Sequence, residues 1–245
     1  PATTGATWSS GSAAAASWTQ ARASPSPITN DAPIFEYIYG RKQGGQALPI
    51  LLIATTAGTG SEGNWTAVFT DTDHVKKGFA LPALYPKESI VDPELMTTLS
   101  SRASRARLDA LAHAIESFLS VRANPFSKLY SRQAILWLSE GLPKVQASPS
   151  DLETWERVAL GSTFAGIAIG NAGCTAPHGI EHPISGLLNV AHGEGLAAIY
   201  PDTCGSCAPT RKRILPSWPG FWARRLPALR KRKPRCAPSS RWTPF

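Results

Sequence analysis

Two short segments of the chain carry most of its histidines, at spacings that suit a metal ion. Asp109 and His113 are four residues apart, so on a helix both side chains project from one face. His178 and His182 repeat this spacing, and His192 follows fourteen residues after His178. An aspartate and imidazoles that converge from separate segments form a mixed oxygen–nitrogen ligand set for a divalent transition metal. Such a metal acts as a Lewis acid on an alcohol or carbonyl oxygen.

An apolar run followed by a glycine-rich segment predicts a strand that leads into a loop. The run at 48–54 is typical of a buried parallel strand. Residues 55–62 then contain two glycines and four hydroxyl side chains. Backbone N–H groups and hydroxyls in such a segment can bind a phosphate, although similar turns are common as plain loops. Residues 89–91 predict a second strand, which ends at Asp92 as N-cap and Pro93 as the first helical residue.

From residue 107 onward the apolar residues recur at helical spacing. The first predicted helix holds the Asp–His pair. Glu116, one turn beyond His113 on the same face, is either a partner of the metal-binding residues or a helix-surface carboxylate, and we favour the surface carboxylate. A second helix is predicted over 124–143, from an Asn-Pro pair to a Gly-Leu-Pro stop. The motif Ser-Asp-Leu-Glu at 150–153 predicts a capping box that opens a long helix toward Gly173.

The change of pattern divides the chain into three parts. Residues 1–100 are predicted to be an α/β portion, a partial dinucleotide-binding fold, and residues 101–202 an incomplete all-α metal-binding domain. The tail, residues 203–245, contains eleven lysines or arginines, seven prolines and no acidic residue. By difference, residues 1–202 hold 14 basic and 17 acidic side chains, so the tail supplies the whole net charge of +8.

The tail has two interpretations. Basic clusters interleaved with tryptophans suit phosphates and bases, which predicts a disordered arm that binds nucleic acid non-specifically. The same composition is typical of a GC-rich gene read out of frame, which is the interpretation we favour. We also expect a fragment, because the chain opens on Pro1 and its one methionine is Met96. With no apolar run approaching about 18 residues and no signal peptide visible, we expect a cytoplasmic protein without a membrane span.

Taken together and in order, the motifs resemble the iron-containing (group III) alcohol dehydrogenase family over about residues 31–202. They are the Thr/Gly-rich segment 55–62, Asp92-Pro93, the segment 109–116 (Asp-Ala-Leu-Ala-His-Ala-Ile-Glu), Ala123-Asn124-Pro125, and His178, His182 and His192-Gly193. The resemblance implies a dehydroquinate synthase-like fold. It also implies an NAD(P)-linked enzyme that transfers a hydride between a small alcohol and an aldehyde, with a homodimer as a possible assembly.

The resemblance further implies roles for individual residues. Those that it assigns to Fe²⁺ or Zn²⁺ are Asp109, His113, His178 and His192. It sets His182 beside the metal, where it relays a proton or contacts the nicotinamide. Those that it assigns to NAD or NADP are Gly11, Ser12, Thr55, Thr56, Thr59 and Lys76. Lys77 is the alternative to Lys76 in this role, and a solvated surface lysine is the other interpretation of this position. Neither the choice of metal nor that of cofactor can be made from the sequence.

Two segments depart from the family pattern. A Gly-Gly-Gly-Ser turn is expected where residues 9–12 read Ser-Ser-Gly-Ser, and Arg107 stands in place of a glycine close to the metal aspartate. We therefore expect the 245-residue chain to oxidise alcohols weakly or not at all, and a non-catalytic remnant of the family is the alternative. Cys174, just before the second histidine pair, we interpret as a small packed residue.

Overall fold

The computed structural model describes residues 32, 34–43, 49–99 and 107–206. Residues 1–200 form one compact unit and 201–245 a second one. The division near residue 100 and the nature of the tail stay predictions, and most of the tail lies outside the described residues. The predicted cofactor turn at Gly11 and Ser12 lies outside them as well.

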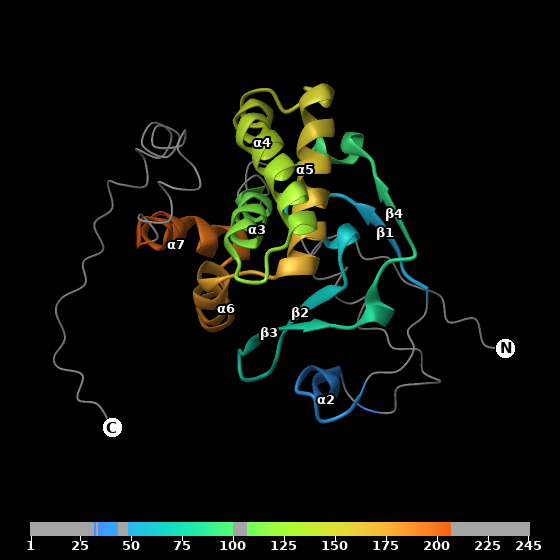
Figure 1. Cartoon of the computed structure of the whole chain (residues 1–245), viewed down its shortest axis with the longest axis vertical. Coiled ribbons are helices and arrows are strands. Elements are labelled where there is room, and N and C mark those ends of the chain that lie inside the picture. The colour runs from blue at the N-terminus through green and yellow to red at the C-terminus, as the bar shows by residue number, and fades with distance from the viewer. Residues whose placement is uncertain (1–31, 33, 44–48, 100–106, 207–245) are drawn as a thin grey trace. The chain divides into compact units, whose positions relative to one another are not determined.

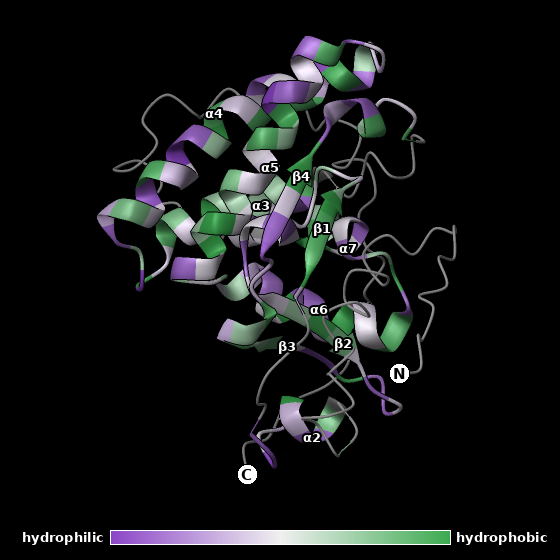
Figure 2. Cartoon of the chain, turned by 90° about the vertical axis from the view of Figure 1, so that its right-hand side faces the viewer, coloured by the Kyte–Doolittle hydropathy of each residue, from purple (hydrophilic) through white to green (hydrophobic). Residues whose placement is uncertain are grey.

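The two strands predicted from the sequence pair with each other. β1 (Leu51–Ala54) runs parallel to β4 (Glu88–Val91), with Leu51 opposite Glu88. Their order and direction agree with an α/β portion. The predicted full burial of β1 is wrong, because its side chains alternate between exposed and buried. Figure 2 shows β1 as hydrophobic along its whole length, so one apolar face is exposed to solvent.

An antiparallel hairpin, which the sequence analysis did not predict, separates β1 from β4. It consists of β2 (Thr66–Thr70) and β3 (Lys76–Ala80). The Asp71 carboxylate closes its turn by accepting hydrogen bonds from two backbone N–H groups, those of Asp73 and Val75. The short helical segments of this half are α2 (Ile34–Ile38), η1 (Ser61–Gly63), η2 (Pro82–Leu84) and η3 (Pro93–Met96).

The other half of the described chain is helical (Figure 1). Its helices are α3 (Arg107–Leu119), α4 (Pro125–Ala147), α5 (Leu152–Ala172), α6 (Ala176–Leu188) and α7 (His192–Ser206). The first three pack against one another, and α5 also packs against η1 and η3. Alanines and β-branched residues fill the contacts between them, which brings the helix backbones close together.

The predicted helix ends are correct in two places and wrong in three. Asn124 caps α4, and Gly173 ends α5 with a φ of 69°. However, α4 continues through its predicted stop to Ala147, because its last turn still buries apolar side chains. The cap of α5 is Asp151, which accepts a hydrogen bond from the Thr154 N–H, and not the preceding serine. Helical structure also continues past residue 202, the predicted end of the all-α portion, since α7 runs on to Ser206.

Among the described residues, no single helix has both the length and the apolar composition to span a membrane. α5 and α6 reach that threshold only as a pair, and they are bent by 102° at the break between them.

Candidate metal centre

Helix α3 contributes three buried polar side chains from one face. Asp109, His113 and Glu116 are 3%, 6% and 1% exposed, and the neighbouring alanines on α3 are buried as well. Their i, i+4, i+7 spacing sets all three on the side of the helix that faces the protein interior. The interpretation of Glu116 as an exposed surface carboxylate is therefore wrong.

Helix α6 and the start of α7 supply the other side chains. His178 and Glu181 are buried on α6, whereas His182 on the same helix is half-buried. Asn189 ends α6 in the left-handed region, with a φ of 50°, and this lets the chain turn back. That turn brings His192, the first residue of α7, to the other histidines.

The Asp109 carboxylate lies at the middle of the cluster. Its Oδ1 is 3.3 Å from Nε2 of His113, 3.3 Å from Nε2 of His178 and 3.4 Å from Nε2 of His192. The structure thus brings together all four side chains to which the resemblance assigned the metal. These separations are longer than the charge-assisted hydrogen bonds of proteins, which are about 2.7–2.9 Å. These three separations from Asp109 match the spacing of about 3.3–3.6 Å between ligand atoms that are bonded tetrahedrally at 2.0–2.2 Å to one ion, and the ligand atoms of Asp109, His178 and His192 all lie within 4.8 Å of one another.

Two further carboxylates hold the histidines in the orientation of metal ligands. Glu116 lies 2.7 Å from Nδ1 of His178, and Glu181 is paired with Nδ1 of His192. A hydrogen on Nδ1 leaves Nε2 with a lone pair, and Nε2 is the atom that faces Asp109 in both rings. The donor set therefore fits a divalent cation. In His178 and His192 the Nδ1 atom is held by a glutamate, and the Nε2 atom is free to coordinate the cation.

Of these two carboxylates, Glu181 was not predicted from the sequence, and Glu116 was considered as a partner of the site but not favoured. Glu116 also accepts a hydrogen bond from the backbone N–H of Thr175, the N-cap of α6, and so ties the start of that helix to α3. Its position seven residues after Asp109 was a signal for a shared face. Glu181 offers a weaker signal, because its burial depends on the way that α7 packs over it.

The electrostatics of the cluster follow from this mutual pairing. Burial disfavours the charged form of Asp109, but the imidazoles of His113 and His192 outweigh it and hold its pKa well below the usual range. Burial likewise opposes a charged His178, yet its hydrogen bond to Asp109 raises its pKa well above normal. The pKa of His192 is raised against the effect of burial by the charge of Asp109. A cation bound at the centre would replace these protons.

Lys76 lies beside this cluster rather than on an open surface. Its Nζ is 2.9 Å from the Ser185 hydroxyl, 3.1 Å from Nδ1 of His192 and 3.5 Å from Glu181. Gly186 makes this approach possible, because a Cβ there would lie 2.2 Å from a backbone oxygen of the β2–β3 turn. The pKa of Lys76 is lowered by burial, against the opposing charge of Glu181. Its contact with a cofactor stays a prediction.

The loop after β1 holds the other predicted cofactor residues, and it packs against α5. Thr55, Thr56 and Thr59 are half-buried in this loop. Gly60 has a φ of 57°, and a Cβ on it would lie 2.3 Å from a carbonyl oxygen of α5. The glycines were predicted to let the backbone approach a phosphate, and for Gly60 the structure adds this close helix contact. Glu62 anchors the loop further by accepting a hydrogen bond of 2.7 Å from Thr163 on α5.

His182 lies at the edge of the cluster without joining the Asp109 contacts. Its ring centroid is 5.4 Å from that of His192 and 6.0 Å from that of His178. Burial and the positive charge of Lys76 lower the pKa of His182 to about 4, so its imidazole is neutral at pH 7.

Comparison with known proteins decides the family. The profile described as "Iron-containing alcohol dehydrogenase" matches residues 11–93, and "Fe-containing alcohol dehydrogenase family, C-terminal" matches residues 104–214. The chain belongs to the iron-containing alcohol dehydrogenase family. The first match begins at Gly11 and the second continues past residue 202, so the family resemblance extends further at both ends than the predicted range of about 31–202.

Curated and solved relatives agree with this assignment. The NAD-dependent methanol dehydrogenase of Bacillus methanolicus is 36% identical over 159 residues, which are 64% of this chain and 42% of the relative. Long-chain-alcohol dehydrogenase 1 of Geobacillus thermodenitrificans is 37% identical over 65% of this chain and 40% of its own. The crystal structure of NADH-dependent butanol dehydrogenase A from Thermotoga maritima matches with a TM-score of 0.68 and 30% identity, over 75% of this chain and 48% of that one. The chain spans less than half the length of these relatives.

Proposed function

We propose that this chain carries the metal-binding centre of an NAD(H)-linked alcohol dehydrogenase that interconverts small primary alcohols and aldehydes. The observation that supports it is the single carboxylate oxygen of Asp109 with three imidazole Nε2 atoms at 3.3–3.4 Å around it. In this proposal Asp109, His113, His178 and His192 hold one divalent cation. The cation supplies a Lewis acid that lowers the pKa of an alcohol hydroxyl.

The surrounding carboxylates act through the histidines. Glu116 and Glu181 accept the Nδ1 hydrogens of His178 and His192 and keep their Nε2 atoms directed at Asp109. Because these glutamates are buried, the imidazole rings have little freedom to turn away. The site is thereby organised before a cation or a substrate arrives, which reduces the cost of assembling it.

His182 is suited to accept the proton of the alcohol. Its imidazole is neutral at pH 7, half-buried and next to His192. A neutral imidazole has a free lone pair for the hydroxyl proton and can pass that proton on to solvent. In the reverse direction the same nitrogen returns a proton to the oxygen of the reduced aldehyde.

The dinucleotide is proposed to bind at the loop after β1, where Thr55, Thr56 and Thr59 offer hydroxyl groups beside backbone N–H groups. The choice of NAD over NADP and of a primary alcohol follows the names of two relatives, an NAD-dependent methanol dehydrogenase and an NADH-dependent butanol dehydrogenase. The homodimer and the cytoplasmic location remain predictions from the sequence, as does the choice between iron and zinc.

The test combines metal binding with hydride transfer. The chain is freed of metal, titrated with Fe²⁺ or Zn²⁺ without oxygen, and mixed with NADH or NADPH and butyraldehyde while nicotinamide fluorescence is followed. We expect one bound cation per chain and slow, metal-dependent oxidation of NADH, which His182→Ala slows without changing the stoichiometry. A chain that binds no divalent cation, or turnover that persists after chelation, would overturn the proposal. One tightly bound cation without any hydride transfer would instead favour the non-catalytic alternative.

A further inference from the structure

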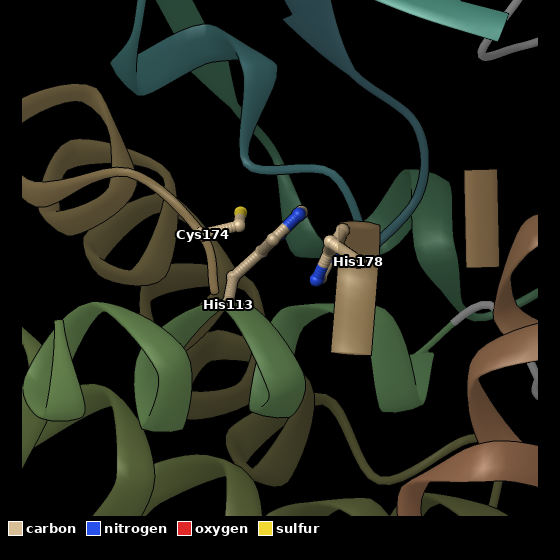
Figure 3. Close-up of side chains that lie close together, drawn as sticks. All are labelled: His113, Cys174 and His178. Carbon is tan, nitrogen blue, oxygen red and sulfur yellow. The ribbon is translucent and has the colours of Figure 1, made fainter. Parts of the chain in front are cut away.

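A thiol lies against the histidine cluster, beside His113 and His178. Cys174 lies in the short connection between α5 and α6, next to His113 of α3 and His178 of α6 (Figure 3). One ligand atom from each of these three residues lies within 4.8 Å of the other two. As a whole residue Cys174 is exposed, in contrast to the two buried histidines. The interpretation of Cys174 as a packed residue is therefore wrong.

His178 belongs to two triads in which the ligand atoms lie within 4.8 Å of one another. The other triad consists of Asp109, His178 and His192, which offers oxygen and nitrogen. The Cys174 triad offers nitrogen and sulfur. Soft thiolate ligands favour zinc-type cations, whereas carboxylate and imidazole ligands accept iron and manganese as readily. The two triads therefore differ in the cation that they prefer.

His113 is the histidine with the freedom to serve either triad. His178 and His192 each have Nδ1 paired with a buried glutamate. The Nδ1 atom of His113 is buried and has no hydrogen-bond partner among the described residues. No carboxylate thus accepts a hydrogen from Nδ1 of His113, and its ring stacks on that of His178 with centroids 4.6 Å apart.

We propose that Cys174 is a metal ligand, which with His113 and His178 gives this centre a nitrogen–sulfur position for a borderline-soft divalent cation, Zn²⁺ in the first place. Binding there forms a metal–sulfur bond and releases the thiol proton to solvent. The inference rests on the proposed metal centre and refines it, because it makes zinc rather than iron the preferred cation of this chain.

The experiment uses cobalt as a spectroscopic probe in the full chain. Cys204, Cys207 and Cys236 are first replaced by serine, so that Cys174 is the one thiol left. The metal-free protein is titrated with Co²⁺, and its absorption is compared with that of the same protein carrying Cys174→Ser or Cys174→Ala. We expect a near-ultraviolet thiolate-to-cobalt charge-transfer band that both variants lose, while the visible bands of cobalt bound by oxygen and nitrogen remain.

Competition with a softer and a harder cation gives a second readout. Cd²⁺ affinity should fall at least about tenfold in Cys174→Ser, whereas Mn²⁺ affinity should stay unchanged. Visible cobalt bands without a charge-transfer band, or Cd²⁺ affinity that Cys174→Ser leaves intact, would overturn the role of Cys174 and leave the proposed function standing. A chain that binds no Co²⁺ at all would overturn both. Far-ultraviolet circular dichroism of each variant excludes misfolding as the reason for a lost band.

Discussion

The helical half and the strand half of this chain are organised differently around their predicted sites. In the helical half, each side chain of the metal cluster is buried or half-buried and has a defined partner, with Glu116 and Glu181 behind two of the histidines. In the strand half, the loop after β1 follows a parallel sheet that has two strands among the described residues. Parallel sheets are ordinarily covered on both faces.

The difference shows where each site takes its support. The metal cluster is held by side-chain contacts within α3, α6 and the start of α7, all inside residues 107–200. The loop after β1 instead takes its position from α5, through the contact at Gly60 and the hydrogen bond between Glu62 and Thr163. We therefore expect substitutions in the helical half to change cation affinity, and substitutions in the strand half to change stability and cofactor binding.

The largest effect is expected from Asp109→Asn. The amide keeps the shape of the side chain but removes the negative charge shared by three imidazoles, so cation affinity should fall by about 100-fold or more. Isothermal titration with Zn²⁺ measures this change. Glu153→Gln, on the exposed surface of α5, is the matched control and should bind normally. Normal affinity in Asp109→Asn would show that the cluster is not a metal centre.

Gly60→Ala tests the dependence of the cofactor loop on α5. The added Cβ would lie 2.3 Å from the Ser162 carbonyl oxygen, so we expect a loss of about 3 kcal/mol or more in the free energy of unfolding. Gly40→Ala is the control, because Gly40 also has a positive φ, of 72°, but nothing lies within 4 Å of its Cβ position. That variant should lose only the left-handed strain of about 1–2 kcal/mol. Equal losses in urea unfolding would mean that the contact with α5 does not position the loop.

Glu116→Gln is expected to weaken cation binding by about tenfold, less than the aspartate substitution. The glutamine oxygen can still accept the Nδ1 hydrogen of His178, but without the charge that makes the imidazole a stronger ligand. Glu140→Gln, exposed on α4, should have no effect. If Glu116→Gln matched the loss in Asp109→Asn, the two carboxylates would have to be equal partners of the cation.

The metal-free and metal-loaded proteins should respond oppositely to pH. The pKa values of Asp109 and Glu116 are lowered in the fold, so their stabilising effect is present above about pH 4 and is lost in acid. Those of His178 and His192 are raised, so their contribution is complete below about pH 6.5 and decreases as pH rises through the folded values. Metal-free protein should thus lose stability as pH rises above about 6.5, whereas Zn²⁺ binding should strengthen because it requires deprotonated imidazoles. Thermal unfolding with and without Zn²⁺ across this range gives both slopes, and parallel slopes would contradict the pairing of these groups.

The smallest effect is expected on the exposed face of the parallel strands. Ile90 is 48% exposed on β4, and Ile90→Lys should change the free energy of unfolding by less than about 0.5 kcal/mol. Leu52→Ala, on the buried face of β1, should cost about 2–4 kcal/mol, because it removes a side chain from the core that it shares with Ile50 and Leu84. A large loss from Ile90→Lys in chemical denaturation would reveal that another surface covers this face.

Local sequence signals predicted much of the secondary structure. The Asn-Pro start of α4 and the glycine that ends α5 are chemical signals read over three or four residues, and both are correct. The antiparallel hairpin was missed because its turn depends on the Asp71 side chain and on an unusual His74 with a φ of 62°, for which no Gly or Asn-Gly signal exists. The continuation of α4 through Pro143 was missed because packing of the last turn outweighs the break.

The sequence by itself determined the donor types of the metal cluster, because the four-residue spacings of Asp109 with His113 and of His178 with His182 fix which side chains share a helix face. Only the tertiary structure decided which further groups join them. Burial of Glu116 and Glu181, the approach of Lys76 and the proximity of Cys174 depend on how α3, α6, α7 and the hairpin meet. Helical periodicity extends over a few turns, whereas contacts such as Glu116 with Thr175 and Lys76 with Ser185 join residues 59 and 109 positions apart, for which a local pattern carries no information.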